Sequence, residues 1–197
     1  MVSALVVFVH PVPDSFTASI RDSVVGGLRA GGHLVDLADL YAEGFDPRLT
    51  ADEHANHRLG PEHKPVATAW AERLRACDTL VLVYPTWWSA QPAMLKGWFE
   101  RVWVNGVAVA VHEDGRIPSP LLTNIRRTVA VTTHGSSKLV NSLQGEPGKR
   151  FVKRALRGAV NRRCRIEWIA FYGNDRAGAR QRTRFLQRVT RRFGRMP

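Results

Sequence analysis

Five short apolar runs recur along the chain, and the segments between them repeat apolar residues every three or four positions. The runs lie at residues 4–10, 34–40, 79–84, 128–133 and 165–171. Continuous runs rich in Val, Ile and Leu are typical of strands buried on both faces of a parallel sheet, whereas 34–40 is interrupted by Asp and predicts a half-exposed strand. The pattern therefore predicts five strands that alternate with helices.

Single apolar stripes mark the intervening helices. Phe16, Ile20, Val24 and Leu28 repeat every four positions, and Gly31 and Gly32 then end the segment. Similar stripes predict four more helices: Val66, Trp70, Leu74 and Cys77; Leu95, Trp98, Phe99 and Val102; Val152, Ala155, Leu156 and Ala159 within 148–160; and Phe185, Val189 and Phe193. Right-handed crossovers place such strands in one sheet covered on both faces, and five strands fit the flavodoxin-like α/β order 2-1-3-4-5.

Length and composition agree with one domain. With 197 residues, of which 44% are hydrophobic, the chain can bury a single core, so we expect one flavodoxin-like domain over residues 1–197. The chain starts with a strand-like segment and has no run of about 18 apolar residues, so we expect a soluble cytoplasmic protein without signal peptide or membrane insertion. Cys77 and Cys164 form no CxxC motif, and we interpret both as reduced core residues.

The positive charge is concentrated in the C-terminal quarter. The net charge is +12, yet residues 149–197 contain 16 of the 29 Lys and Arg and only two acids, Glu167 and Asp175. Such a surface could attract phosphate-bearing ligands, an acidic partner or RNA, and its charge alone does not distinguish them. A nucleic-acid binder is a remaining alternative, but no nucleic acid is expected, because the row from Arg180 to Arg192 is typical of a solvated helix face.

Residues 46–64 are polar and contain His54, His57 and His63. Their spacing matches no structural or catalytic zinc pattern, so we expect no metal site. The segment is long for a compact domain, and we interpret it as a solvated lid or a dimer-contact loop.

Three polar loops follow strands one, three and four, whose carboxyl ends meet at the switch point of the predicted order. In the first loop, His10, Ser15 and Thr17 precede a helix, and backbone N–H groups at a helix N-terminus bind phosphate well. The alternative is that Asp14 or Ser15 only caps the helix.

The second loop lies between Pro85, which ends the central strand, and Pro92, which fits the first position of the next helix. It contains Thr86, Trp87, Trp88 and Ser89. Each indole has roughly 150–250 Å² to bury, worth about 4–6 kcal/mol. A flat aromatic ligand would cover that area; alternatively, the rings pack under the next helix or in a subunit interface.

The third loop, TTHGSS (132–137), offers small polar groups that could bond the polar edge of a ring. Together, a phosphate loop, an aromatic loop and a hydrogen-bonding loop are the parts needed to bind FMN. No GxSxG elbow and no complete nucleotide P-loop compete with this interpretation.

These segments resemble the flavodoxin-like NAD(P)H:quinone oxidoreductases. The resemblance rests on HPVPDSF (10–16), GHLVDLADLYAEGFDP (32–47), YPTWWSAQPAMLKGWFERVW (84–103) and TTHGSSKLVNSLQG (132–145). It implies a homodimer that binds FMN, or the larger FAD, and passes two electrons from NAD(P)H by ping-pong hydride transfer to a quinone or similar small-molecule acceptor. An alternative within the family is a flavin-binding ancillary subunit of a transport system whose reductase activity is secondary.

The resemblance also assigns roles to the loop residues. The phosphate loop falls on His10, Ser15, Phe16 and Thr17; the ring-contact loop on Pro85, Thr86, Trp87, Trp88 and Ser89; and the pyrimidine-edge loop on Thr132, Thr133, His134 and Gly135. Backbone N–H groups near Thr133–Gly135 are expected to stabilise charge on the reduced flavin.

The sequence departs from the family at two positions. Asn141 and Pro147 replace a Tyr and a His that support that charge in mammalian-type relatives. His134 could take over part of this catalytic role; the alternative is a loop residue that points to solvent.

Overall fold

A five-stranded parallel sheet forms the centre of the molecule. The computed structural model describes residues 1–197, and the strand order is β2-β1-β3-β6-β7. Every neighbouring pair in this sheet is parallel. The strands are β1 (Ser3–Phe8), β2 (Leu34–Asp39), β3 (Thr79–Pro85), β6 (Arg127–His134) and β7 (Arg165–Tyr172). The short strands β4 (Val109–Ala110) and β5 (Ser119–Pro120) form a separate antiparallel pair, so the main sheet has the predicted order 2-1-3-4-5.

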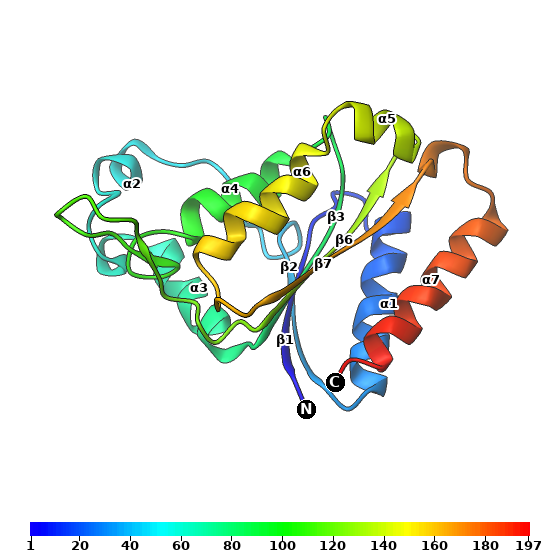
Figure 1. Ribbon diagram of the computed structural model, residues 1–197, viewed down its shortest axis with the longest axis horizontal. Helices are drawn as coiled ribbons and strands as arrows, with labels where there is room; N and C mark the ends of the chain where they lie inside the picture. Colours follow the sequence, from blue (N-terminus) through cyan, green and yellow to red (C-terminus); the bar gives the residue numbers. More distant parts are fainter.

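Helices cover both faces of the sheet. They are α1 (Phe16–Ala30), α2 (Ala51–Ala55), α3 (Pro65–Ala76), α4 (Ala93–Val102), α5 (Lys138–Leu143), α6 (Pro147–Arg150) and α7 (Ala179–Gly194). Figure 1 shows α1 and α7 on one side of the strands and α3, α4 and α6 on the other. None of the helices combines the length and the apolar character needed to cross a bilayer.

Each face of the sheet has its own apolar core. One core lies under α3 and α4, and the other lies between the sheet and the pair α1 and α7. Every residue of β3 and β6 is buried, as the apolar run of β3 predicts, and β6 also buries polar residues at both of its ends. The helices α1 and α7 approach so closely at Gly27 that a Cβ there would lie 2.6 Å from the carbonyl oxygen of Thr190. Glycine at this position therefore permits the helix pair to form.

The helix after the central strand begins one residue later than expected. Pro92 has φ −56° and ψ 152° and is the N-cap of α4, not its first helical residue. The predicted stripe nevertheless faces the core, because Leu95, Trp98, Phe99 and Val102 are all buried. The prediction for this helix was thus correct in its buried face and wrong by one residue at its start.

The helix predicted over 148–160 is not regular. The chain makes the short helix α6, then a π-helical turn at Phe151–Ala155 and a 3₁₀ turn at Leu156–Gly158. The wider π turn changes the angular spacing of the side chains, so Ala155 is exposed although the α-helical spacing places it in the core. The preceding helix α5 was not predicted.

The segment 46–64 is mostly exposed, as its polar composition predicts, but it is anchored to α4 through Glu53. Thr50 and Glu53 form a capping box at the start of α2, with reciprocal bonds of 3.1 and 2.9 Å. The carboxylate of Glu53 also accepts bonds from the guanidinium of Arg101 on α4 at 2.7 and 3.0 Å, and both side chains are about 10% exposed. Burial raises the pKa of Glu53, but the bonds from Arg101 and Thr50 outweigh it and lower the pKa.

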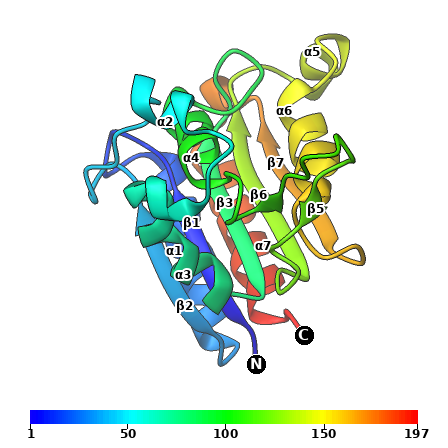
Figure 2. The same ribbon diagram turned by 90° about the vertical axis from the view of Figure 1, so that its left-hand side faces the viewer.

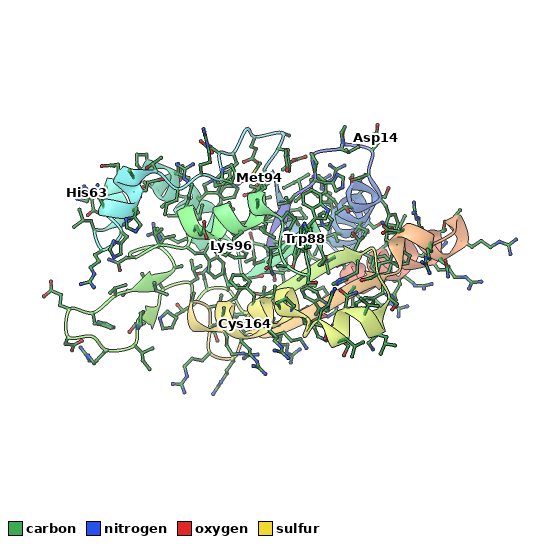
Figure 3. The ribbon with its side chains drawn as sticks, turned by 90° about the horizontal axis from the view of Figure 1, so that it is seen from above. Asp14, His63, Trp88, Met94, Lys96 and Cys164 are labelled. Carbon is green, nitrogen blue, oxygen red and sulfur yellow. The ribbon has the colours of Figure 1, made fainter.

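The segment 46–64 also contains His54, His57 and His63. No group of three or more His, Cys, Asp or Glu side chains there or elsewhere is arranged to hold a metal ion. In Figure 3, His63 lies at the left-hand edge of the molecule, well away from Asp14, which precedes α1.

Both cysteines are free and buried, as expected. Burial raises the pKa of the Cys77 thiol to about 12. The thiolate needed for disulfide exchange is therefore scarce in the folded protein.

We expect Glu53→Ala to destabilise the fold by about 3 kcal/mol, because it leaves the buried Arg101 guanidinium without its counter-charge and removes half of the capping box. Urea unfolding at neutral pH measures the change. Glu62→Ala, on the same segment but with its side chain 68% exposed, serves as the control and should have little effect. Equal stability losses for the two variants would show that the Glu53–Arg101 pair does not hold the segment.

Candidate functional site

Three polar loops gather at the carboxyl ends of adjacent strands. Because β3 lies between β1 and β6, the loops that follow these strands are neighbours. Figure 2 shows the strands side by side in this order, and Figure 3 looks down on the molecule from above, with Trp88 near the middle of the view. The sheet order alone brings together residues about 120 positions apart in the sequence.

The first loop ends in the N-terminus of α1. Ser15 is the N-cap, and its hydroxyl accepts the N–H of Ala18 at 3.1 Å. Capping by Ser15 is therefore present, but it leaves the backbone N–H groups of Phe16 and Thr17 without an acceptor in the protein. The Nδ1 atom of His10 lies 3.0 Å from the N–H of Val12, which orders the start of the loop. Two free donors at the positive end of a helix suit a phosphate group.

The second loop exposes both tryptophans. Trp87 is 42% exposed and Trp88 is fully exposed. Trp88 and Ser89 have φ values of 48° and 63°, a left-handed conformation that costs such residues about 1–3 kcal/mol each. Reciprocal backbone bonds between Trp87 and Ala90 hold this turn. The rings therefore do not pack under α4, which leaves a ligand or a second subunit to cover them.

Contacts tie the second loop to the first and third. The rings of His10 and Trp87 lie 6.2 Å apart. The Thr86 N–H donates to the carbonyl oxygen of Thr133 at 2.8 Å, and the hydroxyls of Thr86 and Thr132 lie 2.8 Å apart.

Further along, the Ser89 hydroxyl donates to Gln144 Oε1 at 2.7 Å, and the Gly148 N–H donates to the Ser89 carbonyl oxygen at 3.1 Å. Contacts thus link the three loops, and of the residues that the sequence assigned to cofactor binding, Thr17, Pro85, Thr132, Thr133 and His134 are buried.

His134 does not point to solvent. It is only 4% exposed, and its ring stacks on Tyr172 with a centroid distance of 4.6 Å and an interplanar angle of 19°. Its Nδ1 atom lies 2.7 Å from Asn141 Oδ1. The Asn141 amide nitrogen donates to Ser136 Oγ and to the Ser137 carbonyl oxygen, so Oδ1 faces the histidine and accepts.

The hydrogen bond to Asn141 fixes the tautomer of His134. Because Asn141 Oδ1 can only accept, the proton of the neutral imidazole lies on Nδ1. Nε2 is then a free acceptor, and it lies 3.5 Å from the Thr86 hydroxyl. Asn141 thereby directs a basic nitrogen toward the loop that carries the tryptophans.

Sequence reasoning missed the residues that surround this histidine. The Tyr172 hydroxyl donates to Glu146 Oε1 at 3.0 Å, and Lys149 pairs with the same carboxylate. The bond from Lys149 lowers the pKa of Glu146. Tyr172 ends a strand and Glu146 has a left-handed backbone, with φ 46°. Neither feature produces a recognisable spacing in the sequence, so no local signal could have found them.

Comparison with known proteins agrees with this architecture. A sequence profile for proteins described as having a flavodoxin-like fold matches residues 3–194. The chain belongs to this flavodoxin-like family. The recognised resemblance to a family of flavodoxin-like oxidoreductases is thereby confirmed, because relatives with oxidoreductase names match as well.

Three similar proteins illustrate the family. Ribosyldihydronicotinamide dehydrogenase [quinone] of Pongo abelii is 31% identical over 151 residues, which are 68% of this chain and 64% of that protein. The structure of the NAD(P)H:quinone oxidoreductase from Methanothermobacter marburgensis covers all of this chain at a TM-score of 0.83 and 25% identity, and 99% of that chain is aligned. An FMN-dependent NADH-azoreductase from Bacillus anthracis, solved in complex with FMN, shares the fold at a TM-score of 0.78 and 14% identity, with 99% of each chain covered.

The matches to the curated relatives are partial in length. The first three of them are matched over 53%, 64% and 58% of their own length. The matched region thus spans between about half and two thirds of the length of these curated relatives.

Burial lowers the pKa of His134 below its ordinary value of 6.5. On acidification the unfolded chain therefore binds this proton before the folded protein does. The His134 contribution to stability is constant above pH 6.5 and is lost as the pH falls from 6.5 toward the lowered folded value.

We expect His134→Gln to lose less stability than the wild type between about pH 7.5 and about pH 5.5, because glutamine does not titrate. Urea unfolding at the two pH values measures the difference. His63→Gln makes the same replacement at an exposed ring and serves as the control. A His134→Gln protein with the wild-type dependence would refute the buried neutral state.

Proposed function

We propose that this protein binds FMN across the three loops and reduces a quinone or similar small-molecule acceptor with electrons from NAD(P)H. The observation that carries the proposal is the juxtaposition of free helix N-terminal donors, exposed indole rings and hydrogen-bonding groups on loops that contacts link together. The oxidoreductase names of the relatives and the FMN complex of a protein with the same fold support it.

The donor set fits FMN. The N–H groups of Phe16 and Thr17 suit a terminal phosphate, which FMN carries and FAD does not. Trp87 offers an exposed indole face for a flat ring, and the Thr132 and Thr133 loop offers polar groups for the edge of that ring. His10, Ser15 and Thr17 would surround the phosphate, and Pro85, Thr86, Trp88, Ser89 and Gly135 would complete the contacts to the ring.

The bound flavin would supply the redox chemistry, taking two electrons from NAD(P)H and passing them to the acceptor. The protein binds and orients the ring. The N–H of Gly135 has no acceptor in the protein, so it is free to stabilise negative charge at the polar edge of the ring.

His134 acts through the Thr86 hydroxyl. Its neutral ring carries the proton on Nδ1, which donates to Asn141 Oδ1. Nε2 is therefore free to accept a hydrogen bond from the Thr86 hydroxyl. The Thr86 oxygen can then accept from Thr132 at 2.8 Å, which orders the polar edge of the site.

We also propose a homodimer. Trp88 and several apolar side chains of α5 and of a more distant loop are strongly exposed, and a second subunit would cover them. These side chains are Ile117 at 90%, Leu139 at 70% and Leu143 at 81% exposure.

The proposal predicts that the purified protein binds FMN, measured as quenching of flavin fluorescence on titration. Thr17→Val should weaken FMN binding about tenfold or more but leave riboflavin binding unchanged, because riboflavin lacks the phosphate. Trp87→Ala should weaken both ligands about tenfold, because the ring loses its stacking partner.

Leu34→Ala is the matched control for that titration, since Leu34 is an exposed apolar residue at the amino end of β2 and should change neither affinity. A wild-type protein that does not bind FMN would refute the proposed function.

Steady-state kinetics test the order of the reaction. Since one exposed ring face would serve NAD(P)H and acceptor in turn, initial rates should give parallel double-reciprocal lines at different fixed acceptor concentrations. Intersecting lines would show that both substrates bind before any electrons move.

A further inference from the structure

The outer edge of β7 is an unpaired row of backbone groups. β7 pairs with β6 alone and is the last strand of the sheet. The N–H groups of Arg165 and Gly173, at its two ends, donate toward the β6 side, to Arg126 and Ser136. Backbone groups in a parallel strand alternate in direction, so the N–H and C=O groups of Trp168 and Ala170 point away from β6. They form a template for a further strand.

A groove of about 550 Å³ runs along this edge. Its floor is Trp168, Ile169 and Ala170 of β7. Lys149 and Lys153 line it from the α6 side of the sheet, and Arg188 and Arg192 line it from α7 on the opposite side. We call this feature the β7 groove. It straddles the sheet edge, and it lies apart from the tryptophans of the proposed flavin site.

The β7 groove is strongly basic. Within it, Glu167 is the only acid, and it is already paired with Arg192. Lys138, Lys153 and Arg188 have no carboxylate partner. An adjoining cavity of about 660 Å³ shares Tyr172 and Arg188 with the groove and adds Arg176, Arg184 and Arg191 without any acid. Much of the excess charge of the C-terminal quarter therefore lies around one open strand.

We propose that the β7 groove binds an extended acidic segment of a partner protein, which adds to the sheet as a sixth strand beside β7. Only a peptide backbone offers donors and acceptors at the spacing of the unpaired row. The acidic side chains of the added strand would lie beside Lys and Arg side chains on both sides of the groove, and its apolar side chains would contact Trp168. A second copy of this chain fits poorly, because it would place the same cations opposite each other.

A fluorescein-labelled peptide of about ten residues that alternates Glu and Val is a suitable probe. Fluorescence anisotropy should show saturable binding that weakens with salt. Ala170→Pro removes an outward N–H without breaking the bonds to β6, and it should weaken binding about tenfold or more. The double variant Lys153→Glu with Arg188→Glu should weaken it by a similar factor or more, because it reverses charge on both walls.

Controls separate strand addition from simple attraction between charges. The double variant Arg157→Glu with Arg162→Glu makes the same charge change outside the groove and should bind the peptide nearly as well as the wild type. The same peptide N-methylated at every residue keeps its charge but cannot donate backbone bonds, and it should bind about tenfold more weakly. This measurement leaves the protein unaltered and therefore does not depend on the folding of the proline variant.

Two results would overturn the proposal. Equal affinity for the methylated and unmethylated peptides would show that the edge of β7 takes no part. Tighter binding of a duplex DNA of equal charge, with no effect of Ala170→Pro, would assign the groove to nucleic acid. Far-ultraviolet circular dichroism of each variant reports on the integrity of the fold without FMN, so failure of this proposal is distinguishable from failure of the proposed function.

Discussion

The burial of a parallel sheet on both faces is the constraint on which the rest of the structure depends. β3 and β6 have no exposed residue, so their backbone groups must be satisfied by neighbouring strands and their side chains by helices on each side. Right-handed crossovers then fix the order of the strands. This order brings the ends of β1, β3 and β6 together, and it also leaves β7 with one free edge.

The proposed flavin site uses the rigidity of that scaffold. The loop after β3 is strained at Trp88 and Ser89, and it is held by bonds from Thr86 to the β6 segment and from Ser89 to Gln144. The strain persists because these contacts fix both ends of the loop. Two indole rings are consequently presented to solvent, next to the free N–H groups of α1, and not buried in the core.

The two proposed binding surfaces differ in their physical basis. At the three loops, specificity would come from the shape and polarity of a few side chains around a flat ring. At the β7 groove, it would come from an unpaired backbone flanked by cations from both faces of the sheet. The same fold produces both, because an open sheet has loops at one end and a free strand at each side. A partner on β7 would leave the tryptophan loop accessible.

The sequence by itself determined the five strands, the buried face of most helices, the start of α1 at Phe16 and the three loops at the switch point. These features depend on local periodicity and on capping, and both are set by residues that are close together in the sequence. The capping box of Thr50 and Glu53 was also a local signal, although the polar composition around it obscured it.

Only the tertiary structure decided that Ala155 is exposed, that Glu53 meets Arg101, and that His134 is buried between Asn141 and Tyr172. Each of these depends on which elements pack together and in what register, and residues 38 or 48 positions apart carry no shared local pattern.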